Sequence, residues 1–297
     1  MIFLTLFIFG LPQDLQNIVD WFDRIGGPVG FEMLTLDNDA VIIGSGGLYS
    51  GNTVGSIAKN PSYLLFNPRS ALLLSHRNHI AGSKLENIVY ARMASWGYYG
   101  FSAKGYFSDN MELHGEVPGP TGETYNGYDL SFRFNLGKRY KDISLGMGIK
   151  WLKEVILTRE YSDYAFDFGM TRATPVGEIV FSFLNVGPKY MGGAKFRLPL
   201  TWRLGLYLPT YKFSYGEIKV GGELVKLLNT VTQFYSGCQL NLRDLLYFRI
   251  GKKFRSPLEI FSIGFGLSYS NFCIDYSFSR YYNEIGSSNL ITLNWGV

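Results

Sequence analysis

The stretch ISLGMGIKW, which runs from Ile143 to Trp151, alternates strictly between two kinds of side chain. Its odd-numbered residues are all large and apolar, whereas its even-numbered residues are serine, glycine and lysine. Successive side chains of a β-strand point to opposite faces of the sheet, so this pattern predicts a strand with one apolar face and one small or polar face. Whether water or lipid meets the apolar face determines the class of fold.

The same alternation recurs along most of the chain. Six further segments show it without interruption: Leu130 to Leu136, Tyr164 to Met170, Trp202 to Leu208, Ile263 to Tyr269, Phe272 to Phe278 and Ile291 to Val297. Weaker strand candidates are Leu73 to Ala81, Glu86 to Met93, Gly97 to Phe107, Val176 to Leu184, Tyr211 to Val220 and Leu246 to Arg255. Bacterial membrane barrels contain an even number of strands, so these segments predict about 14. The Pro- and Gly-rich stretch Glu116 to Gly127 is expected to be a long external loop, and Gly221 to Thr230 is a candidate for a short helical excursion.

The small and polar face identifies the interior of the sheet. Half of its positions in the clear segments are Gly or Ser, and a Gly weakens a strand unless another backbone approaches it closely. These glycines therefore indicate a crowded interior, and the apolar face is the outer one. Charged residues have the same parity as the glycines, and an Arg that faced lipid would cost roughly 2 to 4 kcal/mol. They are Arg133, Lys150, Asp167, Arg203, Arg249 and Asp275. We therefore predict an all-β fold, a transmembrane antiparallel β-barrel whose lumen contains ion pairs.

Composition agrees with a membrane barrel and excludes several functions. Of 297 residues, 16% are aromatic and 18% are charged, whereas soluble domains have about 25% charged residues. The net charge of +4 arises from scattered basic residues, so no nucleic-acid partner is predicted. Cys238 and Cys273 have neither the spacing of a zinc site nor that of a disulfide framework. No metal or cofactor is predicted, and a single disulfide between the two cysteines stays open.

The histidines do not support an enzyme. The chain contains only His76, His79 and His114, and the sequence SHRNH places Ser75 directly before His76. Adjacent side chains of a strand point to opposite faces, which prevents the hydrogen bond that a serine nucleophile and its base require. No catalytic residue is predicted.

The N-terminal region differs from the rest of the chain. An apolar run from Ile2 to Leu11 is too short to span a membrane as a helix and has the length of a signal-peptide core. Residues 1–12 are therefore a candidate signal peptide, with a buried apolar strand as the alternative. Further on, Asn60-Pro61 and Asn67-Pro68 each combine a favoured N-cap with a favoured first helical residue. They predict two brief helical turns, Ser62 to Phe66 and Arg69 to Leu72.

One long N-terminal stretch carries a family resemblance. FEMLTLDNDAVIIGSGGLYSGNTVGSIAKNPSYLLFNPRSALLL, residues 31–74, is similar to the N-terminal signature of the PorV/PorQ family of outer-membrane proteins, which are relatives of the FadL long-chain fatty-acid transporters. The resemblance implies a barrel of about 14 strands at residues 73–297, in the outer membrane of a Gram-negative-type bacterium. Residues 13–72 would form an N-terminal segment and lumen plug with short helices. The implied plug residues are Gly44, Gly46, Gly47, Asn60, Pro61, Asn67 and Pro68, and the candidates for lining the lumen or a ligand are Tyr63, Phe66, Arg133 and Arg203.

The resemblance implies two non-enzymatic functions. The PorV/PorQ side implies a docking or accessory component for protein secretion, in the type IX system or a related process, with secreted proteins or secretion-system components as partners. The alternative, from the FadL side, is passive transport of hydrophobic small molecules through a plugged lumen. A continuous apolar tunnel past Tyr63 to Phe66 would favour transport, and a solidly filled lumen would argue against it.

Overall fold

The computed structural model describes residue 20 and residues 27–48, 53–63, 70–114, 120–188, 196–282 and 285–296. The candidate signal peptide at residues 1–12 lies outside the described residues, and so do Phe66, Asn67 and Pro68.

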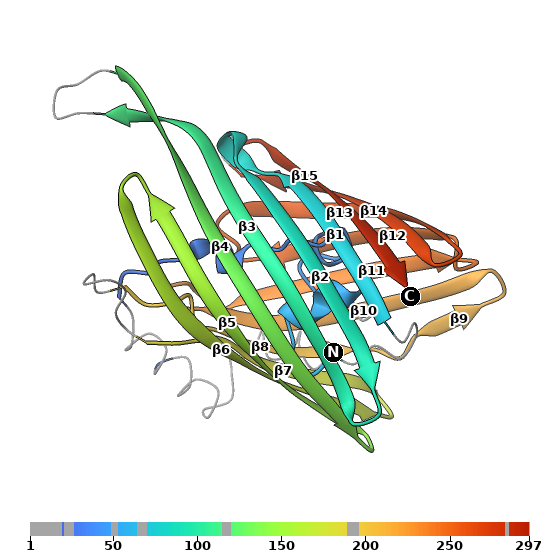
Figure 1. Ribbon diagram of the computed structural model, residues 1–297. Coiled ribbons are helices and arrows are strands. Elements are labelled where there is room, and N and C mark those ends of the chain that lie inside the picture. The colour runs from blue at the N-terminus through green and yellow to red at the C-terminus, as the bar shows by residue number, and fades with distance from the viewer. Residues whose placement is uncertain are drawn as a thin grey trace.

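In this described part of the chain, fifteen strands form a single antiparallel sheet whose two ends meet (Figure 1). They are β1 (Ser70–Asn78), β2 (Lys84–Ala94), β3 (Gly97–His114), β4 (Pro120–Tyr140), β5 (Ile143–Ile156), β6 (Arg159–Thr174), β7 (Gly177–Val186), β8 (Thr201–Tyr207), β9 (Tyr211–Phe213), β10 (Gly216–Leu227), β11 (Gln233–Leu242), β12 (Leu246–Phe254), β13 (Glu259–Tyr269), β14 (Phe272–Tyr281) and β15 (Ser287–Gly296). Each strand pairs with its neighbours in sequence except that β8 and β9 both pair with β10, and β1 pairs with β15. The sheet is therefore closed.

Strands β8 and β9 are two parts of one wall strand. β8 pairs with the second half of β10, and β9 pairs with the first three residues of the same strand. The interruption falls at Leu208 to Thr210, where Pro209 has no N–H to donate to a ladder. Counting β8 and β9 together gives 14 wall strands, which confirms the predicted barrel.

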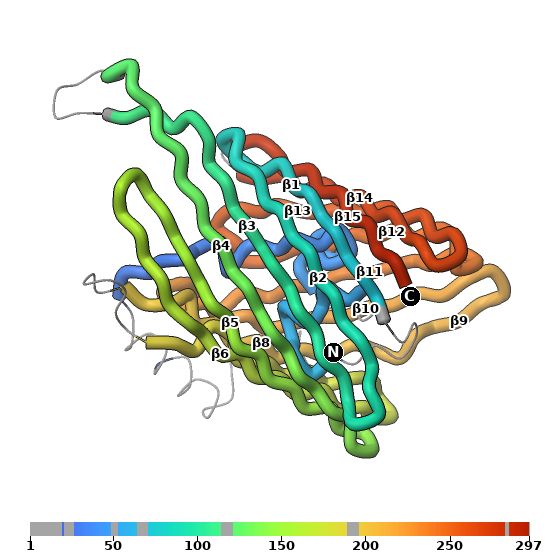
Figure 2. Tube along the Cα trace, viewed as in Figure 1, coloured from blue at the N-terminus to red at the C-terminus, as the bar shows by residue number. Residues whose placement is uncertain are grey.

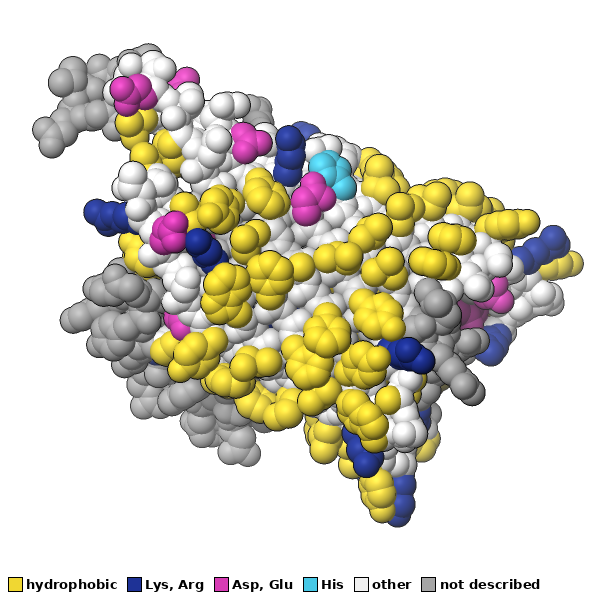
Figure 3. All heavy atoms as spheres, in the orientation of Figure 1, with side chains coloured by type: hydrophobic (Ala, Val, Ile, Leu, Met, Phe, Trp, Pro, Cys, Tyr) yellow, Lys and Arg dark blue, Asp and Glu magenta, His cyan; other side chains and the backbone are white. Residues whose placement is uncertain are grey.

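The two faces of the wall have the predicted character. In β5, Ile149 and Trp151 are 46% and 48% exposed on the outside, whereas Lys150 between them is 1% exposed. Apolar side chains form a broad belt over the outer surface of the strands (Figure 3). The charged residues expected on the inner face are buried and pair within the lumen, for example Arg249 Nη1 with Asp275 Oδ1 at 2.7 Å.

The two ends of the barrel differ in their connections. At one end, two-residue turns join neighbouring strands at 95–96, 141–142, 175–176 and 270–271, and β1 begins and β15 ends there. We call this the short-turn end. The opposite, long-loop end has the connection between β7 and β8 and the hairpin of β3 and β4, which projects from the barrel (Figure 1).

Several sequence-based boundaries were wrong. The expected loop Glu116 to Gly127 is strand from Pro120 onward, because Thr124 and Tyr125 pair with β3 in the projecting hairpin. The segment 221–230, a candidate for a short helical excursion, is strand up to Leu227, and the expected single strand at 211–220 is a hairpin of β9 and β10. Strand β11 was not predicted, because Tyr235 on its inner face and Ser236 on its outer face break the alternation. Cys238 and Cys273 are both free thiols, on β11 and β14.

Residues 27–48 and 53–63, which we call the inner segment, run inside the ring of strands, as the blue trace in Figure 2 shows. They contain the 3₁₀ turns η1 (Glu32–Thr35) and η2 (Val54–Ala58) and the short helix α3 (Ala40–Gly44); a further 3₁₀ turn, η3 (Ile80–Gly82), connects β1 and β2. In the described part of the chain, no helix has the length and apolar character needed to cross a membrane.

Candidate functional site

The wall holds the inner segment through polar side chains that bond its backbone. Ser75 Oγ donates to the carbonyl of Asn38 at 2.7 Å, and Arg77 Nη1 donates to that of Asp37 at 2.6 Å. The N–H of Ala40 donates to Thr292 Oγ1 at 2.9 Å. Backbone outside long helices and sheets leaves many N–H and C=O groups without a hydrogen bond inside the segment. When such groups are buried, other residues must supply the hydrogen bonds. Inward-facing residues of β1 and β15 supply them.

Asp39, the N-cap of helix α3, also joins the two parts of the inner segment. The Asp39 carboxylate accepts from the N–H of Val41 at 2.9 Å, as an N-cap does, and from Thr53 Oγ1 at 2.6 Å. Burial raises the pKa of Asp39 to about 6. This carboxylate therefore links α3 to the start of η2.

Wall glycines contact the turn that follows α3. Gly44, Gly46 and Gly47 were predicted plug residues, and the first two lie against Gly264 and Gly251 of neighbouring strands. A side-chain carbon on Gly251 would collide with the backbone of Gly46, and one on Gly44 would lie 2.8 Å from the Gly264 Cα. The crowded interior inferred from the glycines is therefore this backbone-to-backbone contact.

A second glycine contact holds the Asn60-Pro61 turn. Side-chain carbons on Gly146 and Gly169 would collide with Pro61 and Asn60. No helix begins at Pro61 or Ser62, and residues 64–66 of the predicted turn Ser62 to Phe66 lie outside the described residues. Asn60 Oδ1 accepts from the N–H of Ser62 at 2.9 Å, and the Tyr63 N–H donates to the Asn60 carbonyl at 3.1 Å, so Asn60 closes a tight turn after η2.

The predicted helical turn Arg69 to Leu72 was wrong. Strand β1 begins at Ser70, and its pairing with β2 starts at the same residue. The alternation of β1 buries Ala71 and Leu73 on the inner face. Pairing with two neighbouring strands therefore outweighs the local helix signal of the second Asn-Pro.

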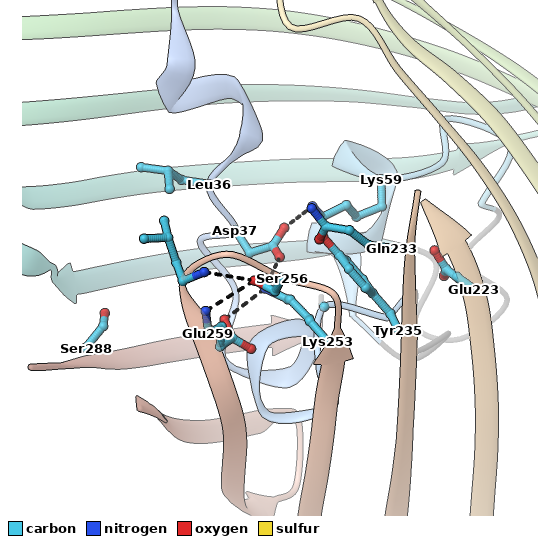
Figure 4. A network of polar contacts seen from close by, with 12 residues as sticks. Leu36, Asp37, Lys59, Glu223, Gln233, Tyr235, Lys253, Ser256, Glu259 and Ser288 are labelled. Carbon is cyan, nitrogen blue, oxygen red and sulfur yellow. Dashed lines mark hydrogen bonds and ion pairs between the residues drawn. The ribbon is translucent and has the colours of Figure 1, made fainter. Parts of the chain in front are cut away.

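A buried charge cluster fixes the middle of the inner segment to the wall (Figure 4). Asp37 forms an ion pair with Lys59 and lies 3.7 Å from Lys253 Nζ, which in turn contacts Glu259 Oε2 at 2.9 Å. Burial opposes ionisation of Asp37, but the ammonium groups of Lys59 and Lys253 outweigh it and hold its pKa below the usual range. Burial lowers the pKa of Lys59 to about 8, so this ammonium is still largely charged at neutral pH.

The two arginines predicted to line the lumen belong to ion pairs. Arg133 Nη2 lies 3.3 Å from Asp167 Oδ2, and Arg203 Nη2 lies 2.6 Å from Glu223 Oε2. Arg203 also donates to the Gly47 carbonyl at 2.6 Å, which ties it to the inner segment. Together these two arginines line a polar cavity of about 50 Å³.

A much larger cavity, of about 510 Å³, lies at the short-turn end. Leu48 and Tyr63 of the inner segment line it, together with Ala173 near the end of β6 and Tyr207 at the end of β8. The charge cluster around Asp37 lies between this cavity and the long-loop end, where Lys253 and Glu259 flank the β12–β13 connection. In the described part of the lumen, the route past Tyr63 therefore meets charged side chains and no continuous apolar tunnel is seen.

The same cavity reaches the interruption between β8 and β9. Leu208, Pro209 and Thr210 all line it. Its lining includes both inward-facing and outward-facing residues of the wall. On β10, Gly221 faces inward and Val220 faces outward. This site was not predicted from the sequence; the signal that could have indicated it is Pro209, which follows a clear strand.

Comparison with known proteins identifies the fold. No protein-family model matches the chain, and no curated protein matches its sequence. Among solved structures it is similar to the toluene transporter TbuX of Ralstonia pickettii, with a TM-score of 0.57, 10% identity, and coverage of 88% of this chain and 99% of that chain. It is also similar to the toluene transporter TodX of Pseudomonas putida, with a TM-score of 0.56 and 11% identity. The match covers 87% of this chain and 96% of that chain. A TodX deltaS2S3 mutant, described as a monoaromatic hydrocarbon channel, has a TM-score of 0.59 and 8% identity. The match covers 88% of this chain and 100% of that chain.

The chain has a FadL-like barrel fold. This is an architecture of bacterial outer-membrane transporters, in agreement with the predicted location. At these identities the likeness concerns the fold alone, and the comparisons give no support to the narrower PorV/PorQ resemblance. Among the described residues, no group of three or more His, Cys, Asp or Glu side chains is placed to hold a metal ion.

Proposed function

We propose that this barrel is a passive channel for hydrophobic small molecules. The observation that carries the proposal is the 510 Å³ cavity between the inner segment and an interrupted stretch of the wall. Small-molecule sites are concave and largely apolar with a few polar groups. This cavity combines Leu48, Tyr63 and Tyr207 with hydroxyls such as those of Ser62 and Thr171, and its lining also includes the charged residues Arg139, Asp142, Glu178 and Lys219. The FadL-like fold, whose solved examples here are toluene transporters and a hydrocarbon channel, supports the same function.

The interruption at Pro209 offers the cavity a side path. Between Tyr207 and Tyr211 the wall has no regular ladder beyond the bond from the Leu208 N–H to the Val220 carbonyl at 3.0 Å. A hydrophobic solute in the cavity would leave between β8 and β9 towards the apolar outer face, without crossing the charge cluster around Asp37. Passage from the long-loop end would require the inner segment to shift, because its charged contacts close that route.

Uptake measurements test this function. The chain is produced in the outer membrane of a host that lacks its own hydrophobic-solute channel, and the entry of radiolabelled toluene and of a radiolabelled long-chain fatty acid is followed. We expect uptake of at least one of them above that of the empty host. Ala173→Trp should reduce this uptake, because the indole would fill part of the cavity.

The matched control is Met170→Trp. It introduces the same side chain on the same strand, but Met170 faces outward and is 37% exposed. Equal uptake by wild type, Ala173→Trp and Met170→Trp would contradict a role of the cavity, and no uptake by the wild type of either solute would contradict the channel itself.

A secretion-accessory role remains the second candidate. It rests on the PorV/PorQ resemblance of residues 31–74 and on the charged filling of the lumen. This role predicts that deletion of the protein leaves uptake unchanged and retains exported proteins in the periplasm. Loss of uptake on deletion, together with normal export of proteins, would support the channel.

A further inference from the structure

Three outward-facing columns of the wall carry a basic side chain near the short-turn end. On β2 the column of Ile88 and Tyr90 leads to Arg92, and on β4 that of Phe134 and Leu136 leads to Lys138, with the exposed Tyr140 beyond it. On β6 the outward residues Phe168 and Met170 are followed by Arg172. Each cation therefore lies near the short-turn edge of the apolar belt. Figure 3 shows basic side chains gathered at the tip formed by the β2–β3 and β4–β5 turns, next to the belt.

Aromatic side chains accompany these cations. Trp96 in the β2–β3 turn is 48% exposed and stacks on Tyr99, and Tyr140 beside the β4–β5 turn is 70% exposed. Lys141 places its ammonium 5.4 Å from the centre of the Tyr140 ring. Trp and Tyr gather where a bilayer core meets its headgroups, and long basic side chains reach from that level into the headgroup layer.

The opposite end of the same wall has a different charge pattern. There the outward cations lie beside carboxylates: Lys84 is 3.9 Å from Asp109, and Lys153 is 3.0 Å from Glu160. At the short-turn end Arg172 has such a partner, with its Nε 3.1 Å from Asp142. Among the described residues, no carboxylate lies within 4 Å of the basic groups of Arg92, Lys138 or Lys141.

We propose that Arg92, Lys138 and Lys141 form a binding surface for the phosphate groups of anionic glycerophospholipids. Outer-membrane barrels place their short turns in the periplasm, so this surface would lie in the periplasmic leaflet. Cations without a protein counter-ion at headgroup level attract anionic lipid, with a contribution from each Lys or Arg. The surface lies on the outside of the wall and does not depend on the transport proposed above.

Lipid binding to the purified full-length chain in a zwitterionic detergent tests the proposal. The probes are phosphatidylglycerol and phosphatidylcholine, which share their acyl chains and differ in headgroup charge, and retention is counted by native mass spectrometry. We expect the wild type to prefer phosphatidylglycerol by about tenfold or more. The triple variant Arg92→Gln, Lys138→Gln and Lys141→Gln should lose this preference.

A second triple variant removes the same charge from the other end: Lys84→Gln, Lys153→Gln and Arg159→Gln. It should retain the preference of the wild type, and heat-modifiable migration should show that both variants are folded. If the first triple variant does not fold, Lys138→Gln alone should still reduce the preference. Equal loss in both triple variants, no preference in the wild type, or displacement of phosphatidylglycerol by inorganic phosphate alone would each overturn the proposal, the last because it would indicate a free-anion site.

Discussion

The outer and inner faces of the same strands follow different rules. On the outside, Phe, Leu, Ile, Met and Trp serve equally, because lipid requires only that a side chain be apolar and imposes no shape. On the inside, Gly146 and Gly251 stand where the backbone of the inner segment touches the wall, and charged residues stand where a partner of opposite sign is within reach. A change on the outer face should therefore act through polarity, and a change on the inner face through position.

The largest effect is expected at the inner charge cluster. Asp37→Asn leaves Lys59 buried without its counter-ion, and breaking a buried pair from one side costs about 3 to 5 kcal/mol. Urea unfolding in detergent measures the loss. Adding Lys59→Met to Asp37→Asn should restore much of the stability, because it removes the orphaned charge; if the double variant is less stable than Asp37→Asn, the pair does not have the role assigned to it.

The same variant has a defined pH dependence. Burial holds the folded-state pKa of Lys59 at about 8, below its ordinary value of 10.5. The folded state thus favours the neutral amine, and the contribution of this group to stability falls as the pH drops from 10.5 towards the folded pKa. The Asp37 carboxylate raises the folded-state pKa of Lys59, so this pKa is lower in Asp37→Asn. In the variant, the stability contribution of Lys59 therefore goes on decreasing as the pH drops below about 8. The stability gap between wild type and Asp37→Asn should be larger at pH 7 than at pH 10, and a gap that widens with rising pH would refute this.

A smaller effect is expected on the outer face. Phe168→Arg places a charge in the apolar belt, at a side chain that is 45% exposed, and should cost roughly 2 to 4 kcal/mol. Ala173→Arg, on the same strand but facing the cavity beside Glu178, should cost much less. The fraction that shows heat-modifiable migration reports assembly. If both variants assemble equally well, the assignment of the two faces is wrong.

The sequence predicted the wall well because its pattern has a period that backbone geometry enforces. The six charges predicted to face inward, from Arg133 to Asp275, were placed by parity, and the glycines indicated that a backbone approaches them. Glu223 and Glu259, which are also buried, were not predicted. β11 was missed because the prediction relied on this alternation. In β11, Tyr235 on the inner face and Ser236 on the outer face each have the character expected of the other face. Parity reports which face a residue occupies, and it fails where a single strand mixes both kinds.

The inner segment could be predicted only in outline. Its location followed from the glycines and from the family resemblance, but the turns after α3 and at Asn60 are set by contacts with strands about 100 to 200 residues away. The pairs Asp37 with Lys59 and Lys253 likewise join parts of the chain that no local pattern connects. The cavity depends on the same contacts, because it is the space that the inner segment leaves above the short turns.

The most direct test of the complementarity between the inner face and the inner segment is protease protection of Gly146→Val. The added side chain would collide with Pro61, and overpacking of this kind costs about 1 to 3 kcal/mol. We expect cleavage within residues 53–63 to become faster while heat-modifiable migration persists. Gly127→Val, where a side-chain carbon would lie 3.4 Å from the Val155 carbonyl oxygen, should leave protection unchanged. If Gly146→Val is as protected and as stable as Gly127→Val, the glycines of the wall do not hold the inner segment.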